Sequence, residues 1–295
     1  MTANQILNYA YYPGCSLHAS AGEYDLSTRE LFKTLNIGLT EVSDWFCCGA
    51  TPAHNVDELL SLSLCAKNLE LAEQVEGDLA VACAACFSRL KFTQHTLEEN
   101  EVKRRQVEKA IDAPVKLNGR VKHLLEILAR DLGLERLATS VKKPLKGLKV
   151  ACYYGCLLTR PPEVPNLDCV EAPTIMERVL EAAGAETVAW SHRMECCGAN
   201  FTLSRPGVVI QLTNAILDAA KGAGADCIMV ACPLCHGNLD IRQQEIEGVY
   251  NVSYGMPVFY ITQLVGLACG LSAEQLGLGA LIVNPMPLLK EKQLL

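Results

Sequence analysis

The sequence predicts an α/β fold made of two pseudo-symmetric α/β domains that arose by internal duplication. The first observation is that three cysteine motifs occur twice, at Cys15 and Cys156 (YYPGC, YYGC), Cys47 and Cys196 (CCGAT, CCGAN), and Cys83 and Cys232 (VACAAC, VACPLC). The second is their spacing: the second and third pairs are each 149 residues apart, and the first pair is 141 residues apart. The third is that strand-like and helix-like segments alternate in both halves, which favours mainly parallel sheets.

Each half shows the same order of expected elements. Residues 8–12 and 150–154 are apolar and rich in aromatic or β-branched side chains, which indicates a strand before each Gly–Cys turn. Apolar residues at helical spacing follow, at 26–35 in the first half and at 175–183 in the second half, where Gly184 ends the pattern. A short strand, the CCG motif, a second helix, another strand and a CxxC motif that opens a helix complete each half.

The two domains are expected to span residues 1–140 and 147–295. Residues 131–148 are rich in lysine and contain Pro144 and Gly147, so we expect a linker that leads into a new strand. Residues 102–132, with Leu and Ala among Lys and Glu, are expected to form one surface helix. The unequal offsets place an eight-residue insertion in the second half, in the Pro-rich stretch that starts at Arg160.

The composition argues against several classes of function. Half of the 295 residues are hydrophobic and 20% are charged, which is typical of a globular protein with a core. The net charge of −7 and the lack of a basic run argue against a nucleic-acid partner. The best membrane candidate, residues 256–283, contains Tyr260, Gln263, Glu274 and Gln275, so we expect no membrane span.

The 15 cysteines are the most informative part of the composition. The first residues, MTANQILNYAYY, have no basic region, apolar region and cleavage site of a signal peptide, so we expect a cytoplasmic protein. Thiols stay reduced in that compartment. Many reduced cysteines point to metal or redox chemistry rather than to a disulfide framework.

Ten of the cysteines form two sets of five with matching spacing. The CCG and CxxC motifs are separated by 34 residues in both halves. Because each motif follows a strand or opens a helix, the members of a set should converge at the carboxyl edge of a parallel sheet, where helix N-termini favour thiolates. The expected metal ligands are Cys15, Cys47, Cys48, Cys83 and Cys86 in the first set, and Cys156, Cys196, Cys197, Cys232 and Cys235 in the second.

Three kinds of site are open for these sets. A structural zinc takes four ligands around one ion, and adjacent cysteines such as Cys47 and Cys48 reach one small ion poorly. A multi-iron cluster offers separate irons to neighbouring thiolates, so it is the favoured interpretation. One zinc site, or redox thiols without metal, are the alternatives.

The pattern of one cysteine, a CCG motif and a CxxC motif, present twice, resembles the cysteine-rich CCG family, and within it the catalytic B subunit of heterodisulfide reductase and its bacterial relatives. The resemblance extends from Tyr9 to about Leu271. It implies two noncubane [4Fe–4S] clusters, one per set and both near the domain interface, with a small disulfide split into two thiols between them. It also implies a ferredoxin-like C subunit and a flavin-containing A subunit as electron-donating partners, because the chain has no ferredoxin or nucleotide-binding motif.

Several other residues lie beside the motifs. His236 follows Cys235 and is the candidate catalytic residue, as a proton donor to a leaving thiolate, with a structural hydrogen bond as the alternative. Gly49 and Gly198 are candidate cofactor-binding residues, because a residue without Cβ lets backbone amides approach cluster sulfurs. Three arginines near the second set could bind an anionic substrate: Arg160, Arg193 and Arg205. The five remaining cysteines are expected to be buried, inert thiols: Cys65, Cys152, Cys169, Cys227 and Cys269.

Three functions are compatible with this sequence. The favoured one is the disulfide-reducing subunit of a heterodisulfide reductase-type complex, an oxidoreductase that is active only with its partner subunits. The second is an electron-relay CCG subunit of a succinate dehydrogenase- or benzoyl-CoA reductase-type complex. The third is a sulfur-oxidation subunit that runs thiol chemistry in the opposite direction. Two intact cysteine sets favour the first, because relay relatives often lose one site.

Overall fold

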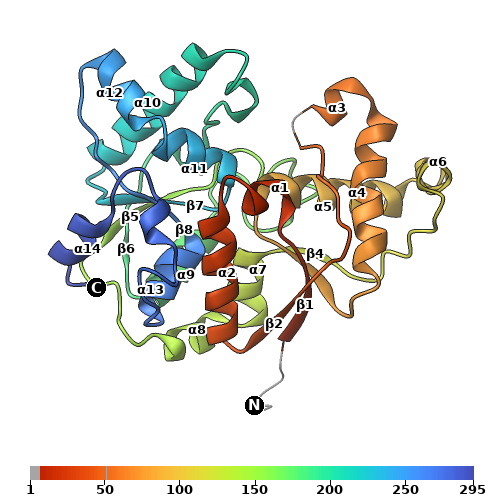
Figure 1. Ribbon diagram of the computed structural model, residues 1–295, viewed down its shortest axis with the longest axis horizontal. Helices are drawn as coiled ribbons and strands as arrows, with labels where there is room; N and C mark the ends of the chain where they lie inside the picture. The colour runs from red at the N-terminus through yellow and green to blue at the C-terminus, as the bar shows by residue number, and fades with distance from the viewer. Residues whose placement is uncertain (1–6, 51) are drawn as a thin grey trace.

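The computed structural model describes residues 7–50 and 52–295. The first half of the chain forms one parallel sheet with its helices, seen on the right of Figure 1. Its elements are β1 (Leu7–Tyr12), α1 (Gly14–His18), α2 (Gly22–Thr34), β2 (Ile37–Glu41), α3 (Ala53–Val56), α4 (Glu58–Ala72), β3 (Asp78–Val81), α5 (Ala84–Glu99), α6 (Glu101–Ile111), β4 (Val121–His123), α7 (Leu124–Glu126), the π-helical turn η1 (Ile127–Asp131) and α8 (Leu134–Ser140).

The second half repeats this arrangement around a second parallel sheet. Its elements are β5 (Lys149–Tyr153), α9 (Ile175–Ala182), β6 (Glu186–Thr187), the 3₁₀ turns η2 (His192–Met194) and η3 (Ala199–Phe201), α10 (Pro206–Gly222), β7 (Cys227–Val230), α11 (Pro233–Asp240), α12 (Gln243–Tyr250), β8 (Val258–Tyr260), α13 (Ile261–Ala268), η4 (Leu278–Ala280) and α14 (Met286–Glu291).

The two sheets have the same topology. Their strand orders are β2-β1-β3-β4 and β6-β5-β7-β8, with every pair parallel. The register is equivalent as well, because Tyr11 pairs with Ala80 in the first sheet and Cys152 pairs with Met229 in the second. The predicted fold class, two similar α/β domains from a duplicated unit, is therefore confirmed. The exact boundaries, 1–140 and 147–295, stay a prediction.

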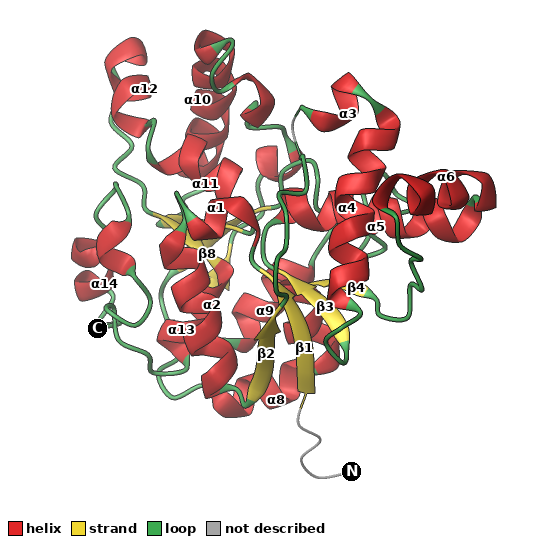
Figure 2. Ribbon diagram, turned by 45° about the vertical axis from the view of Figure 1, so that its right-hand side comes forward, coloured by secondary structure: helices red, strands yellow, loops and turns green. Residues whose placement is uncertain are grey.

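Local sequence explains where the helices begin. Asp57 precedes α4, and its carboxylate accepts a hydrogen bond from the Leu60 amide, 2.7 Å away. Asn100 serves α6 in the same way, and Pro206 occupies the first turn of α10. The central strand β7 is buried along its whole length, as expected for a parallel strand covered on both faces. Figure 2 shows helices on both sides of the strands.

Two expectations about the middle of the chain were wrong. Residues 102–132 do not form one helix, because α6 ends at Ile111 and the chain returns through the edge strand β4 and the π-helical turn η1. Val121 pairs with Leu79 there, a long-range contact that local helical periodicity cannot reveal. The expected linker 131–148 includes the helix α8, and the amides of Lys142 and Lys143 both donate to the carbonyl of Ala268.

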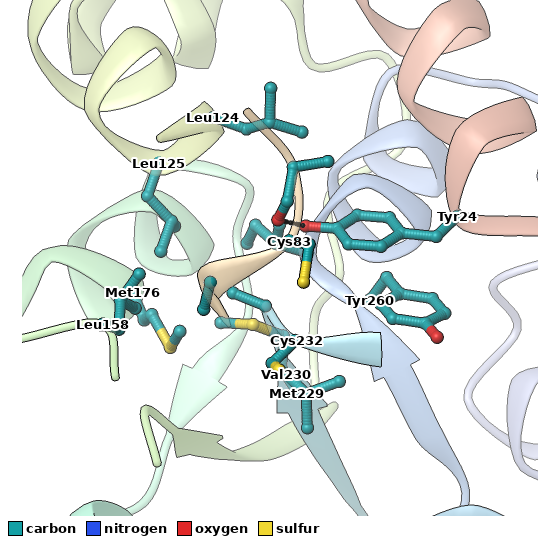
Figure 3. Close-up of a cluster of buried hydrophobic side chains, with 14 of the residues drawn as sticks. Tyr24, Cys83, Leu124, Leu125, Leu158, Met176, Met229, Val230, Cys232 and Tyr260 are labelled. Carbon is teal, nitrogen blue, oxygen red and sulfur yellow. Dashed lines mark hydrogen bonds between the residues drawn. The ribbon is translucent and has the colours of Figure 1, made fainter. Parts of the chain in front are cut away.

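The interface between the halves is extensive and pseudo-symmetric. Helix α2 packs against α13, and its counterpart α9 packs against α7 and η1. The ring of Tyr24 stacks on that of Tyr260, with centroids 4.0 Å apart, and the Tyr24 hydroxyl donates to the carbonyl of Ala82. Figure 3 shows these two rings beside Cys83 and Cys232. The two halves therefore share one buried core where the cysteine motifs meet. Within the described residues, no helix is both long and apolar enough to cross a bilayer.

Lowering the pH is expected to destabilise the chain through His123. The ring is fully buried at the end of β4, and its Nε2 lies 2.9 Å from the carbonyl oxygen of Ala82. Burial lowers the pKa of His123 to about 4. The folded state thus binds fewer protons than the unfolded state, so stability is complete above the ordinary histidine pKa and falls as the pH drops towards 4, by up to about 1.4 kcal/mol per pH unit.

Urea unfolding between pH 7 and pH 5 measures this effect, with His123→Gln as the comparison because an amide can still donate to Ala82. The wild-type chain should lose about 2 kcal/mol more than the variant over this interval. Equal losses in the two proteins would show that His123 does not titrate on unfolding.

Candidate metal centres

Each of the ten predicted cysteines lies in the segment that follows the carboxyl end of a strand. In the first set, Cys15 follows β1, the CCG cysteines follow β2, and the CxxC cysteines follow β3. The second set repeats this order after β5, β6 and β7. The point between the first and third strands is where the strand order reverses, and α/β sheets bind their ligands there. The fold thus gathers each set at one sheet edge, as its spacing predicts.

The sulfur atoms within each set are close together. In the first set, Cys15 and Cys47 have their Sγ atoms 3.6 Å apart, and Cys48 and Cys86 have theirs 3.3 Å apart. The second set gives 3.8 Å for Cys156 and Cys196, and 3.5 Å for Cys197 and Cys235. The equivalence of these pairs means that the two halves present the same donor geometry.

The two sets also meet each other at the interface. The amide of Ala84 donates to the carbonyl of Ala231 across the pseudo-symmetry axis, 3.1 Å away. Cys83 and Cys232, which occupy the N-cap positions of α5 and α11, are therefore neighbours. Figure 3 shows both side chains side by side in the buried core. Hydrogen bonds from Cys235 and Cys83 lower the pKa of Cys232 well below its usual range, which favours a thiolate there.

Both glycines of the CCG motifs adopt positive φ, +66° at Gly49 and +76° at Gly198. The amides of these two glycines point at the first cysteine of each motif, and the Gly198 amide lies 3.3 Å from the Cys196 sulfur. A hydrogen bond from Cys48 and one from the Gly49 amide lower the pKa of Cys47 to about 5. Hydrogen bonds from Cys156 and from the Gly198 amide lower that of Cys196 to about 6. The backbone amides thus favour the thiolate form of Cys47 and of Cys196, the first cysteine of each CCG motif.

Gly49→Ala is expected to destabilise the chain by about 2–4 kcal/mol. A non-glycine residue at positive φ costs about 1–2 kcal/mol, and a Cβ at this position would lie 2.6 Å from the Ala53 Cβ, which adds a packing cost of similar size. Gly133→Ala is the matched control, because it has positive φ and open space around it. Chemical denaturation of the metal-free chains compares them. Equal losses of unfolding free energy in Gly49→Ala and Gly133→Ala would mean that the cost comes from the positive φ alone and not from the contact with Ala53.

A pocket of about 130 Å³ is bounded by the second set. All five cysteines of the second set line it, together with Tyr154, Leu157, Leu234 and Phe201. The first half contributes Ala50, two residues after Cys48, and Ala84 and Ala85, the two residues inside the first CxxC motif. A group held by the second set would therefore lie in this pocket, next to two motifs of the first set.

His236 lies beside this site but does not face it. The residues that line the pocket do not include His236, whose ring is only 5% exposed and stacks on Tyr260, with centroids 4.3 Å apart. Its Nε2 lies 3.0 Å from the carbonyl oxygen of Val258, and burial lowers its pKa to about 4. These contacts support the structural alternative, while the catalytic role of His236 stays a prediction.

Two of the three candidate arginines have a partner within the chain. Arg160 pairs with Glu171 and Arg193 pairs with Glu177, so carboxylates of the chain itself already neutralise both arginines. Arg89 of α5, which the motif analysis did not single out, lines the pocket instead. No local motif marks it, because α5 belongs to the first half and the pocket adjoins the second set.

Four of the five spare cysteines are buried, as expected: Cys65, Cys152, Cys227 and Cys269. The expectation was wrong for Cys169, which is exposed in the loop before α9.

The ten cysteines fit an iron–sulfur group by their chemistry. Soft thiolates are the usual ligands of such clusters, and here backbone amides point at the sulfur atoms of Cys47 and Cys196. Within the described residues, no group of three or more His, Cys, Asp or Glu side chains is arranged around a single-ion position. The number of clusters, their type and the ligation by each cysteine stay predictions.

The profile of the cysteine-rich CCG domain matches residues 9–91 and again residues 150–240. The chain belongs to the CCG family. The two matches cover the two sets of motifs and correspond to the repeated sheets. Membership of this family supports an iron–sulfur redox subunit.

Characterised relatives of this CCG protein span nearly its whole length. The 8-methylmenaquinol:fumarate reductase membrane anchor subunit of Wolinella succinogenes is 33% identical over 94% of this chain and 97% of its own. The B subunit of the ferredoxin:CoB-CoM heterodisulfide reductase of Methanosarcina mazei is 31% identical over 90% of both chains. A protein of Archaeoglobus profundus that is described as similar to the heterodisulfide reductase B subunit is 28% identical over 92% of this chain and 93% of its own. All three names describe subunits or subunit-like proteins, which supports a multi-subunit oxidoreductase.

A crystal structure of a hypothetical protein from Helicobacter pylori has the same fold, with a TM-score of 0.77 over 95% of this CCG protein at 12% identity. The chain spans about half of that protein, 53% of its length. This likeness supports the α/β architecture alone.

Proposed function

We propose that this CCG protein is the disulfide-reducing subunit of a cytoplasmic heterodisulfide reductase-type complex. The observation that carries the proposal is the meeting of the two cysteine sets at the buried interface, because a disulfide needs two electrons and Cys83 of the first set lies beside Cys232 of the second (Figure 3). Each set would hold one [4Fe–4S] cluster, of the noncubane type by family resemblance. When bound, the two clusters would supply one electron each, so that the disulfide takes up two electrons and two protons and leaves as two thiols.

The chain's own residues would position the substrate and exclude water. Tyr154, Leu157 and Leu234 form apolar walls around the pocket, and Phe201 stands at its edge with 45% of its surface exposed. These apolar side chains would exclude water from the second set and from a disulfide that lies against it. The thiols released would lie beside the second set, where the Cys196 thiol already has a lowered pKa.

Electrons must reach this chain from elsewhere. We propose a ferredoxin-like C subunit and a flavin-containing A subunit as the partners, as in the family that the chain resembles. Cys15 and Cys47 are exposed in the first set, and Cys196 in the second, so each set has an edge that a partner can approach. The buried Cys83 and Cys232 then connect the sets through the core.

The second candidate is an electron-transfer subunit of a fumarate reductase-type complex. The relative from Wolinella succinogenes favours it, because its identity and coverage are at least as high as those of the methanogen subunits. In that case the two sets would pass electrons to or from a quinone, and the pocket would bind no disulfide.

The complex purified anaerobically from its own host separates these candidates. With a reduced viologen as donor, the disulfide-reducing subunit should release two thiols per disulfide, which a colorimetric thiol assay measures. Fumarate- or quinone-dependent oxidation of the same donor without thiol release would instead establish the second candidate.

A further inference from the structure

Asn238 places a buried side-chain amide against a cysteine of the second set. It lies on α11 and is 2% exposed. Its Nδ2 atom donates to the carbonyl of Cys197, 3.1 Å away, and also to the Sγ atom of the same cysteine, 3.5 Å away. The side chain of Asn238 is therefore a buried N–H donor to the sulfur atom of a predicted metal ligand.

The orientation of this amide is fixed by its neighbours. A carbonyl oxygen only accepts hydrogen bonds, so the atom of Asn238 that faces the carbonyl of Cys197 must be the nitrogen. On the other side of the amide, the Thr202 hydroxyl donates to Oδ1 of Asn238 over 3.1 Å. Arg242 donates in turn to the carbonyl of Thr202, 3.0 Å away. The nitrogen and the oxygen of Asn238 both have partners, and together these direct its N–H groups towards Cys197.

The duplicated fold provides an internal comparison for this pair of residues. The residue 149 positions before Asn238 is Arg89, and the residue 149 positions before Thr202 is Ala53. Ala53 has no hydroxyl to donate, and the buried Nε atom of Arg89 has no hydrogen-bond partner among residues 7–50 and 52–295. The first half therefore does not repeat the hydrogen bonds of Thr202 and Asn238.

The first half satisfies the equivalent backbone in another way. The carbonyl of Cys48, the counterpart of Cys197, accepts from the thiol of Cys65 at 3.4 Å. Each half thus holds the carbonyl of its second CCG cysteine, but with different donors. The amide donor of the second half reaches the cysteine sulfur as well, so the two sets differ in their surroundings although their cysteines are equivalent.

A hydrogen bond to a ligand sulfur changes the reduction potential of an iron–sulfur group. Reduction adds an electron, and part of its charge lies on the thiolate sulfurs. An N–H donor stabilises this charge more strongly in the reduced state than in the oxidised state, so it raises the potential. Cys197 is only 2% exposed, so little water competes with Asn238 for its sulfur.

We propose that Asn238 is a positioning residue that raises the reduction potential of the group held by the second set, and that Thr202 orients it. The proposal rests on the iron–sulfur part of the proposed function and not on its disulfide chemistry. Because the first half has Arg89 and Ala53 at these positions, the two sets are not interchangeable as electron carriers.

A redox titration of the anaerobically purified, iron-loaded chain tests this proposal. Absorption and electron paramagnetic resonance follow the two clusters during the titration. Asn238→Ala removes the donor, and Thr202→Val removes the hydroxyl that orients it while keeping the shape of the side chain. The Cys156→Ala chain, which we expect to retain only the first cluster, identifies the signal of each set.

Gln243→Ala is the matched control. Gln243 is also a buried amide of the second half, and it is 2% exposed like Asn238. Its side chain bonds only to backbone groups of Leu239 and Met256 among the described residues. This substitution therefore removes a buried amide without removing a donor to a cysteine.

We expect Asn238→Ala to lower the midpoint potential of the second cluster by the equivalent of a roughly tenfold change in the ratio of reduced to oxidised cluster, which is about 59 mV for one electron. Thr202→Val should lower it less, and Gln243→Ala should leave it unchanged. The first cluster should keep its potential in all three variants. Iron analysis checks the loading of each chain, and Thr202→Val carries the test if Asn238→Ala does not retain its second cluster.

An unchanged potential of the second cluster in the iron-loaded variants would overturn the proposal, and so would an equal shift of both clusters. A wild-type chain that holds no iron would overturn it together with the proposed function. If the potential shifts as expected while the complex releases no thiols from a disulfide, the role of Asn238 stands and only the disulfide-reducing function is wrong.

Discussion

Cys156→Ala is expected to remove about half of the iron from each chain, from about eight atoms to about four, if both sets hold four-iron clusters. The Cys156 sulfur lies 3.8 Å from that of Cys196 and lines the pocket, so it is placed to bind the same group as Cys196. A lost thiolate removes a bond to the metal, whereas a lost buried thiol removes only packing. Iron and sulfide analysis, with electron paramagnetic resonance of the reduced protein, measures the change.

Cys152→Ala is the matched control for this prediction, since Cys152 is only four residues away. It is fully buried on β5, in register with Met229, at the position that Tyr11 occupies in the first sheet. Burial raises the pKa of Cys152 well above its usual range, so it has little thiolate character. The Cys152→Ala variant should keep both clusters and lose about 1 kcal/mol of folding stability. Loss of iron from Cys152→Ala with full iron in Cys156→Ala would overturn the alignment of the two halves.

Tyr260→Ala is expected to destabilise the chain by about 3–5 kcal/mol, as for other large aromatic residues removed from a core. Its ring is 1% exposed and lies between two other rings, with Tyr24 of the first half at 4.0 Å and His236 of the second at 4.3 Å. The substitution would leave a cavity at the point where the halves and both CxxC motifs meet. Urea unfolding monitored by circular dichroism gives the change in free energy.

Tyr250→Ala provides the comparison, because Tyr250 is 40% exposed at the end of α12 and should cost less than about 0.5 kcal/mol. A double-mutant cycle of Tyr24 and Tyr260 should show a coupling of about 0.5–1.5 kcal/mol from the stacked pair. Independent effects at the two positions would mean that the rings contribute only their own burial. The interface between the halves would then depend on α2 and α13 rather than on this stack.

The sequence by itself determined the duplicated architecture and the position of each cysteine motif. Constant spacing between Cys47 and Cys196 and between Cys83 and Cys232 required two copies of one unit, and alternating apolar segments required parallel strands. In a parallel sheet every strand ends at the same edge, so motifs that follow strands must gather there. These inferences needed only local patterns and their repetition, which is why they agree with the structure.

The tertiary structure alone decided which side chains and strands contact one another across the chain. Strand β4 has only three residues and forms because Val121 pairs with Leu79, so no local periodicity could separate it from a helix. His236 follows a cysteine in sequence, yet its ring turns towards Tyr260, because α11 presents successive residues to different sides. Arg89 has no sequence neighbour that marks it, and it reaches the second set because the two halves pack through one core. Long-range packing fixes such placements, and neither composition nor spacing contains them.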